Sequence, residues 1–276
     1  MDERIYLARA ALHMWEEPCI SGTKGSGTVF FSGCGLRCCF CQNHDIAIGS
    51  RGRAVSVGRL GEIFLELKEK GAANINLVTG AHYVPQIIEA LDMARRKGLD
   101  IPVVYNSSGY EKTETLKLLE GYVDIYLPDL KYLDPELAQK FSYAPDYVQA
   151  AKAAIGEMVR QTGKCEFGED GYIRKGTIVR HLILPGHTGN SIKALRYLHE
   201  TYGEDIYISI MNQYTPVRKF VEFKELNRKV TKREYEKVLD AAVDMGIQNG
   251  FIQEGETASE SFIPDFDYEG VEKNTP

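Results

Sequence analysis

The feature that most constrains this chain is a group of four cysteines within eight residues, in the run Cys34-Gly-Leu-Arg-Cys-Cys-Phe-Cys41. Cys34, Cys38 and Cys41 have the spacing C-x3-C-x2-C, with an aromatic residue immediately before the last cysteine. Three thiolates this close together can bind three corners of a cubic [4Fe–4S] cluster, which normally takes four protein thiolates. The two cysteines outside this run are isolated in the sequence. The motif therefore predicts a cluster with one iron open to an exogenous molecule.

Two other interpretations of the cysteine run stay open. Structural zinc takes four ligands in tetrahedral geometry, usually as two separated pairs, and Cys39 follows Cys38 too directly to be a good fourth ligand. Disulfides form in oxidising compartments, whereas the segment Met1–Ala11 is charged and helical in pattern and does not read as a signal peptide. The sequence therefore predicts a reducing, cytoplasmic location. Zinc or redox thiols are the alternatives to the cluster.

Composition limits the remaining classes of function. The chain has 276 residues, of which 43% are hydrophobic and 26% charged, and its formal net charge is −6. This length is enough for one α/β domain with a sizeable core. An acidic chain gains little from the phosphate backbone of nucleic acids, and no apolar stretch approaches the roughly 20 residues that cross a bilayer. We therefore expect a single-domain protein with neither nucleic acid nor membrane as a partner.

The chain alternates short apolar or β-branched runs with helical patterns. This alternation predicts parallel strands joined by right-handed crossovers, and six such units predict an incomplete barrel with its site at the C-terminal strand ends. The predicted strands are 28–31, 74–78, 102–106, 125–128, 177–184 and 206–211, with a further candidate at 248–253. The predicted helices are 57–70, 84–97, 113–120, 135–141, 144–162, 191–202 and 232–245.

The cysteine motif, with Phe40 before its last cysteine, resembles the signature of radical S-adenosylmethionine (SAM) enzymes. The stretch from Thr28 to Asn43 is similar to the activating enzymes of glycyl radical proteins such as pyruvate formate-lyase. Segments 76–86 and 250–264 are most similar to the PflX-like branch of that group. The resemblance implies an α/β fold, a partial (β/α)6 TIM-type barrel in a single domain. The barrel would span 28–264, after an N-terminal extension and loop at 1–27 and before a polar tail at 265–276 that we expect to fray.

The resemblance also implies residues that bind SAM or act on substrate. Lys131 would offer a cation to the SAM carboxylate, Asp129 would hold polar groups or a monovalent cation, and Arg180 is the implied catalytic residue facing substrate. The alternatives are a surface ion pair for Asp129 and Lys131, a plain turn at Gly80 and a buried salt bridge at Arg180. The implied SAM-binding residues are Phe40, Thr79, Gly80, Asn106, Ser107, Asp129, Lys131, Asn212, Gln213 and Tyr214, and the implied cluster ligands are Cys34, Cys38 and Cys41.

The site departs from the activating enzymes at three positions. His82 replaces an acidic residue near Gly80, Asn106 replaces an aspartate, and the histidine that relatives carry near Tyr214 is absent. These departures leave the substrate open.

The implied cofactors are a [4Fe–4S] cluster and SAM. In such enzymes the reduced cluster passes one electron to SAM, which breaks into methionine and a 5′-deoxyadenosyl radical that abstracts hydrogen from a substrate. The implied partners are a glycyl radical protein as substrate and a low-potential electron donor such as flavodoxin or ferredoxin. Two alternatives stay open: a radical SAM enzyme acting on a small molecule or peptide side chain, and a non-catalytic metal-binding or redox module.

Overall fold

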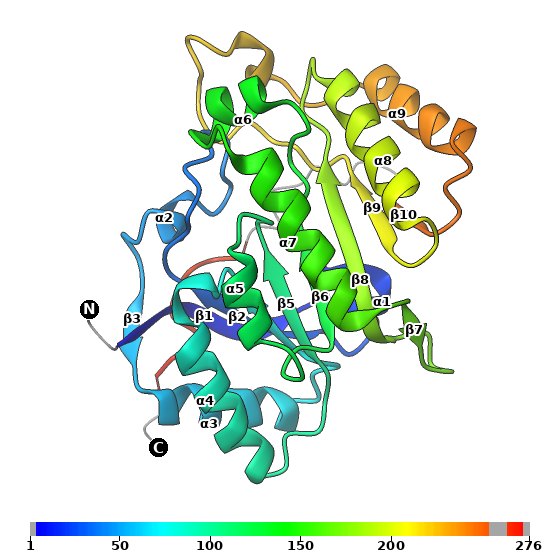
Figure 1. Ribbon diagram of the computed structural model, residues 1–276. Coiled ribbons are helices and arrows are strands. Elements are labelled where there is room, and N and C mark those ends of the chain that lie inside the picture. The colour runs from blue at the N-terminus through cyan, green and yellow to red at the C-terminus, as the bar shows by residue number, and fades with distance from the viewer. Residues whose placement is uncertain (1–3, 254–263, 273–276) are drawn as a thin grey trace.

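The structure is a computed structural model that describes residues 4–253 and 264–272. Its centre is a twisted sheet with the strand order β10-β9-β8-β6-β5-β4-β2-β1-β3 (Figure 1). Within the described residues, each pair of neighbours from β10 to β2 in this order is parallel, and β1 is antiparallel to both β2 and β3. The strands are β1 (Ile5–His13), β2 (Ser26–Phe31), β3 (Arg53–Val55), β4 (Ile75–Val78), β5 (Val103–Ser107), β6 (Ile125–Pro128), β7 (Glu166–Phe167), β8 (Ile173–Leu182), β9 (Tyr207–Met211) and β10 (Gly250–Ile252).

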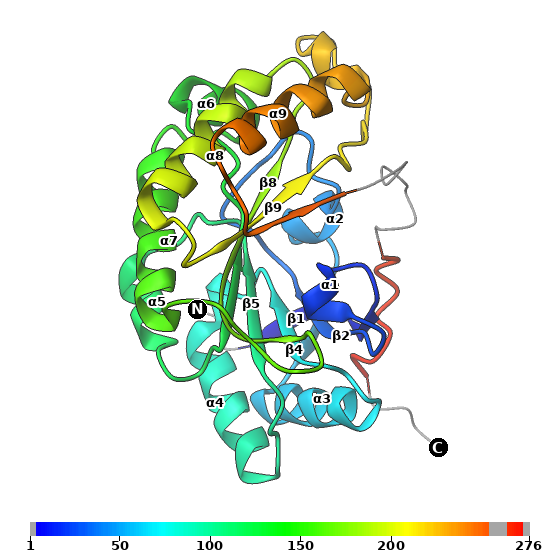
Figure 2. The same ribbon diagram turned by 90° about the vertical axis from the view of Figure 1, so that its right-hand side faces the viewer.

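Helices cover the sheet, and local sequence signals set where several of them begin. The Ser56 side chain caps α3, Asp134 caps α6, and Thr231 with Glu234 forms a capping box at the start of α9. Figure 2 shows α4, α5, α7 and α8 along one side of the sheet, with α1 on the other side. The helices are α1 (Pro18–Ser21), α2 (His44–Ala47), α3 (Val57–Glu69), α4 (Val84–Arg96), α5 (Thr113–Leu118), α6 (Pro135–Ser142), α7 (Tyr147–Thr162), α8 (Thr188–Tyr202) and α9 (Lys232–Asp244), with 3-10 turns η1 (Ala81–Tyr83) and η2 (Lys224–Asn227).

The predicted α/β fold in a single domain, built on an open and mostly parallel sheet, is confirmed. The candidate strand at 248–253 is β10, which pairs in parallel with β9. None of the helices in the described part of the chain is both long and apolar enough to cross a membrane.

The predicted helix near the N-terminus is wrong, because Ile5–His13 forms the strand β1. Leu7, Ala8 and Ala10 are all at most 1% exposed, so side chains on both faces of this segment are buried. Both edges of the strand are also paired, with β2 on one side and β3 on the other. Burial on both faces explains why the segment lacks the polar alternation that marks a half-exposed strand.

The inner face of the sheet is filled by the short helix α1. Successive residues of a strand point to opposite faces, and Val104 of β5 packs with Cys19 and Ile20 of α1, whereas Val103 and Tyr105 pack in the cluster under the outer helices. Ile20 is fully buried. The segment before the first parallel strand therefore closes the lower part of the barrel interior.

The described part of the C-terminal tail is packed, not frayed as predicted. Its backbone follows β1, with the Ala10 N–H donating to the Glu269 carbonyl at 2.8 Å and the Tyr268 N–H donating to Ala8 at 3.1 Å. Arg9 of β1 forms an ion pair with Asp267 at 2.7 Å, and Val271 is 1% exposed. The tail thus continues the pairing of β1 beyond Leu7, where β3 ends and the backbone groups of this edge would otherwise be unpaired.

Candidate functional site

A cavity of about 520 Å³ lies at the C-terminal ends of the parallel strands. Its walls come from the loop after β2, from the ends of β4, β5, β6, β8 and β9, and from the segment between β1 and α1. Convergence of strand ends is the usual reason why such barrels place their chemistry here. The predicted site residues that line the cavity are Cys34, Cys38, Phe40, Cys41, Thr79, Asn106, Ser107, Asp129, Lys131, Arg180, Gln213 and Tyr214.

The three motif cysteines share one wall of this cavity. The Leu36 N–H donates to Cys34 Sγ at 3.5 Å, and the Ser142 hydroxyl donates to Cys38 Sγ at 2.9 Å. Burial raises the pKa of the Cys34 thiol and raises that of Cys41 to about 12. These thiols are therefore neutral until a metal binds and displaces the proton.

Soft thiols on one wall of a cavity suit an iron–sulfur cluster. No three Cys, His, Asp or Glu side chains between residues 4 and 253 or 264 and 272 are placed to share a single metal ion. A cubic cluster makes a different demand, because each thiolate binds its own iron. Cys39 is absent from the cavity wall. It is 7% exposed, and its N–H donates to the Phe141 carbonyl at 2.8 Å.

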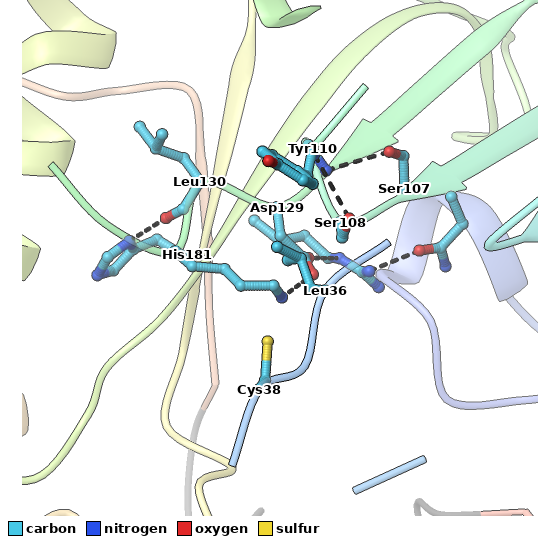
Figure 3. Close-up of polar contacts among 12 residues, drawn as sticks. Leu36, Cys38, Ser107, Ser108, Tyr110, Asp129, Leu130 and His181 are labelled. Atoms are coloured by element: carbon cyan, nitrogen blue, oxygen red, sulfur yellow. Dashed lines mark hydrogen bonds and ion pairs between the residues drawn. The ribbon is translucent and has the colours of Figure 1, made fainter. Parts of the chain in front are cut away.

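A line of partly buried charges shares the cavity with the cysteines, and Figure 3 shows Asp129 at its centre above Cys38. Lys131 Nζ donates to Asp129 Oδ2 at 2.5 Å, and Arg180 Nε donates to Asp129 Oδ1 at 2.9 Å. Burial would raise the pKa of Asp129, but the two cations outweigh it and hold this pKa below the ordinary value. Burial would lower the pKa of both cations, but Asp129, joined at Arg180 by Glu16 and Glu17, outweighs burial and raises both pKa values. The line is therefore ionised at neutral pH, and Figure 3 shows the Cys38 sulfur pointing toward it.

Each of the three guanidinium nitrogens of Arg180 donates a hydrogen bond to another side chain. Besides Nε on Asp129, Nη2 donates to Asn106 Oδ1 at 2.6 Å and Nη1 donates to Glu16 Oε2 at 3.3 Å. Arg180 thus forms the buried salt bridge that the sequence left open as its alternative role. Asp129 and Lys131 are not a surface pair, since their side chains are only 21% and 18% exposed.

The loop after β5 packs tightly against Asp129. Gly109 has a φ of +76°, and a Cβ there would lie 2.3 Å from the Asp129 carbonyl oxygen, so this position requires glycine. The Tyr147 hydroxyl donates to the carbonyls of Ser108 and Asp129 and accepts from the Lys131 N–H at 2.9 Å. One buried tyrosine therefore fixes the backbone of two adjacent cavity walls.

Thr79 and Gly80 differ in their relation to the cavity. Thr79 lines it with a φ of +61°, a conformation that is strained for a β-branched residue and that clusters at active sites and ligand sites. Gly80 is not on the wall, and a Cβ there would meet Ile87 of α4 at 2.7 Å. Close packing of the following helix therefore favours a glycine at this position.

The segment after β9 closes the cavity beside the cysteine loop. The Phe40 and Tyr214 rings meet edge to face at 6.1 Å, and the Tyr214 hydroxyl donates to the Leu226 carbonyl at 2.8 Å. Gln213 lines the cavity and accepts from Gln253 at 3.2 Å. Asn212 is not on the wall, and its N–H donates to Gln253 Oε1 at 2.8 Å.

The cavity floor carries two carboxylates that the sequence interpretation missed, Glu16 and Glu17. Glu16 accepts from Asn76 at 3.1 Å, from Asn106 at 3.3 Å and from Arg180. Burial raises the pKa of both carboxyls, and Arg180 opposes that rise. Within the described structure, Glu17 Oε2 is buried and has no hydrogen-bond partner. Two adjacent acidic residues before a proline were the only sequence signal for this floor.

Fold and site together define an α/β partial-barrel protein with three thiols and a buried ionic line around one cavity. The sequence matches the family model described as the radical SAM superfamily over residues 28–198. The match covers more than half of the chain, and the protein therefore belongs to the radical SAM superfamily. A [4Fe–4S] cluster and SAM, the cofactors predicted from the sequence, are those of this superfamily.

Comparisons with individual proteins give a similar sequence and similar folds. The chain is 28% identical over 244 residues to the uncharacterised protein MJ0674 of Methanocaldococcus jannaschii, covering 86% of this chain and 67% of that one. Its fold is similar to that of SuiB of Streptococcus suis bound to the precursor peptide SuiA, with a TM-score of 0.53, 14% identity, 81% of this chain and 47% of that one. The hydrogenase maturase HydG of Carboxydothermus hydrogenoformans gives a TM-score of 0.53, with 13% identity, 84% of this chain and 54% of that one. The chain thus spans about half the length of these solved structures.

Proposed function

We propose that this protein is a radical SAM enzyme that abstracts hydrogen from the backbone of a glycyl radical protein, as an activating enzyme of the PflX-like branch. One observation carries the proposal: three thiols at the C-x3-C-x2-C spacing share a cavity with the ionised line Lys131–Asp129–Arg180. The similarity of residues 28–43 to activating enzymes supports the protein substrate. The electron would come from a low-potential donor such as flavodoxin or ferredoxin.

The chain's own residues would bind and orient SAM. Cys34, Cys38 and Cys41 would hold the cluster, which with SAM supplies the electron and the carbon radical for hydrogen abstraction. Lys131 would attract the SAM carboxylate, because it lines the same cavity as the thiols and shares its counter-charge, Asp129, with Arg180. Phe40 would pack beside the bound nucleoside and exclude water.

The other predicted residues would complete this cradle. Asn106, Ser107 and Gln213 offer hydrogen-bonding groups of the kind that ribose and adenine require. Arg180 would act by holding Asp129 and Asn106 in place, since its nitrogens are already engaged. We propose that Thr79 and Tyr214 form part of the cavity wall around bound SAM. Gly80 and Asn212, which do not line the cavity, would support the residues that do.

A second candidate is a radical SAM enzyme that acts on a small molecule or a peptide side chain. The acidic floor of the cavity favours it, because Glu17 Oε2 is buried beside a space of about 520 Å³ and has no hydrogen-bond partner among the described residues. A polar or cationic substrate could donate to this oxygen, whereas the CH₂ group of a backbone glycine could not.

Anaerobic reconstitution tests the proposal against a non-catalytic metal module. We expect about four irons per chain and 5′-deoxyadenosine from SAM with dithionite. Replacing Cys34, Cys38 or Cys41 by Ala should abolish this product, whereas Cys39→Ala, the matched control in the same loop, should retain it. One zinc per chain without SAM turnover would reject the enzyme. Formation of a glycyl radical on a partner protein, detected by electron paramagnetic resonance, would separate the two candidate substrates.

A further inference from the structure

The outer side of the cysteine loop lies at the protein surface. Gly35 and Arg37 are exposed, between cysteines that line the cavity on the inner side. The loop abuts the end of α6, where the Arg37 N–H donates to the Ser142 carbonyl at 3.4 Å. The loop after β9 reaches the same place, because Phe223 contacts Phe141 edge to face at 5.2 Å. The cysteine loop, the end of α6 and the loop after β9 therefore meet at this surface.

This surface carries a group of exposed cations, which we name the basic collar: Arg37, Lys140, Arg218 and Lys219. Arg218 lies over the Phe220 ring at 5.2 Å, and this ring is 6.4 Å from that of Phe223. The end of α6 that carries Lys140 contacts the cysteine loop, because the Cys39 N–H donates to the Phe141 carbonyl at 2.8 Å. Lys140 also lies over the Phe223 ring at 5.1 Å, which joins α6 to the loop after β9.

The acidic residues beside the basic collar do not cancel its positive charge. Glu225 is engaged by Lys140 at 3.0 Å and lies 3.5 Å from His187, which leaves Glu222 as the exposed carboxylate between Lys219 and Lys224. The whole chain has a net charge of −6, so a cationic face is the exception on this molecule. Such a local excess of one sign steers partners of the opposite sign.

Apolar side chains are exposed among these charges. Val221 is 83% exposed and Val217 is 39% exposed, on the same loop as Arg218 and Lys219. A small apolar centre with a charged rim is typical of protein–protein interfaces, and weak redox complexes are at the small end of that class. The surface therefore has the chemistry of a transient contact with an acidic protein.

We propose that the basic collar is the docking surface for a small acidic electron-transfer protein of the ferredoxin kind. This inference rests on the proposed function, since it assumes a cluster on Cys34, Cys38 and Cys41. One electron would pass from the reduced donor to that cluster; the donor is oxidised by one electron, the cluster is reduced by one, and no atom is transferred. The collar would orient the donor over the cysteine loop, whose Gly35 and Arg37 are exposed and whose three motif cysteines line the cavity on the inner side.

The test uses the full chain with its reconstituted cluster and an acidic [4Fe–4S] ferredoxin. The variant Arg218→Glu/Lys219→Glu reverses two exposed charges of the collar. The matched control Arg96→Glu/Lys97→Glu reverses two adjacent exposed cations at the end of α4, which Figure 1 shows at the opposite end of the molecule from α6. Kd for the ferredoxin is measured by fluorescence anisotropy at about 20 mM and about 150 mM salt, where screening differs.

We expect the collar variant to weaken ferredoxin binding about tenfold or more at low salt and to lose most of the salt dependence, because rim charges act through long-range attraction. Reduction of the cluster by ferredoxin should slow in parallel, while reduction by dithionite, which needs no docking, should not. Equal Kd values for the wild type and the collar variant would overturn the proposal. So would equal weakening in the control, or binding of a DNA duplex as tight as that of ferredoxin.

Failure of the proposed function would be visible separately. If no cluster assembles, or dithionite does not reduce it, the enzyme assignment fails, yet the ferredoxin Kd still tests the surface. Lys219→Glu alone, at a residue with an exposed side chain, provides a milder variant if the double change alters the thermal midpoint.

Discussion

Glu111 is the group whose ionisation should most visibly control the stability of this site. Its carboxyl is 9% exposed and accepts hydrogen bonds from the hydroxyls of Ser107, at 2.7 Å, and Tyr105, at 3.4 Å. Ser107 lines the cavity, so Glu111 supports that wall from behind. Burial raises the pKa of Glu111 to about 7, from an ordinary value of 4.5.

The direction of the pH effect follows from this raised pKa. Between pH 4.5 and about 7 the folded state binds more protons at Glu111 than the unfolded state does, so stability falls as pH rises. At about 1.4 kcal/mol per pKa unit, the full loss is about 3 kcal/mol, reached above the folded pKa. Between about pH 5 and about pH 8, the loss from this one group should be about 2 kcal/mol.

The substitution Glu111→Gln isolates this contribution, because the amide oxygen can still accept from Ser107 and Tyr105 but carries no charge. Urea unfolding at about pH 5 and about pH 8 gives the free energy of unfolding of each protein. The wild type should lose about 2 kcal/mol more than the variant over this interval, and the variant should be the more stable protein at the higher pH. Parallel pH dependences for the two proteins would refute the argument that Glu111 is protonated in the fold.

Two further substitutions test the charged line and the barrel floor. Asp129→Asn leaves Lys131 and Arg180 buried without their shared counter-charge, so we expect a loss of about 3–5 kcal/mol in the free energy of unfolding and weakened SAM binding by calorimetry; a normal SAM affinity would contradict this role. Ile20→Ala, at a fully buried position, should lower the free energy of unfolding by about 2–5 kcal/mol in urea, whereas the exposed Ile48→Ala should change it little.

The sequence predicted the parallel half of the sheet well because its signals are local. A run such as Ile125–Pro128 is apolar at every position, and the helices between strands carry caps such as Asp134 within a residue or two of where they start. The strand β1 was missed because its pairing with β2 and β3 depends on other segments, and its own residues carry no signal of that pairing. The alanines at positions 8, 10 and 11 favour a helix by propensity, and tertiary pairing overrides that preference.

The residues of the site divide in the same way, into those that have a local sequence signal and those that have none. The cysteine spacing and the Asp129-Leu-Lys131 element are contiguous in sequence, and the structure brings both to one cavity. Glu16 could not be predicted from the sequence as a site residue, because its partners Asn76, Asn106 and Arg180 are 60, 90 and 164 residues away in the chain. A single sequence gives no sign of pairings at such separations.

The N-terminal segment belongs to the site as much as the barrel strands do. The family match begins at residue 28, yet the residues before it supply β1, the inner packing of Ile20 and the carboxylate of Glu16 on Arg180. Without Glu16, Arg180 would keep Asp129 as its one ionic partner, and Asn106 would lose an acceptor in a space where unpaired polar groups are costly. The Asp129 carboxylate would then interact mainly with the Arg180 guanidinium, and its contact with the Lys131 ammonium would change. The orientation of the Lys131 cation, which lines the same cavity as the motif cysteines, therefore depends on a residue outside the matched region, through three consecutive partly buried contacts.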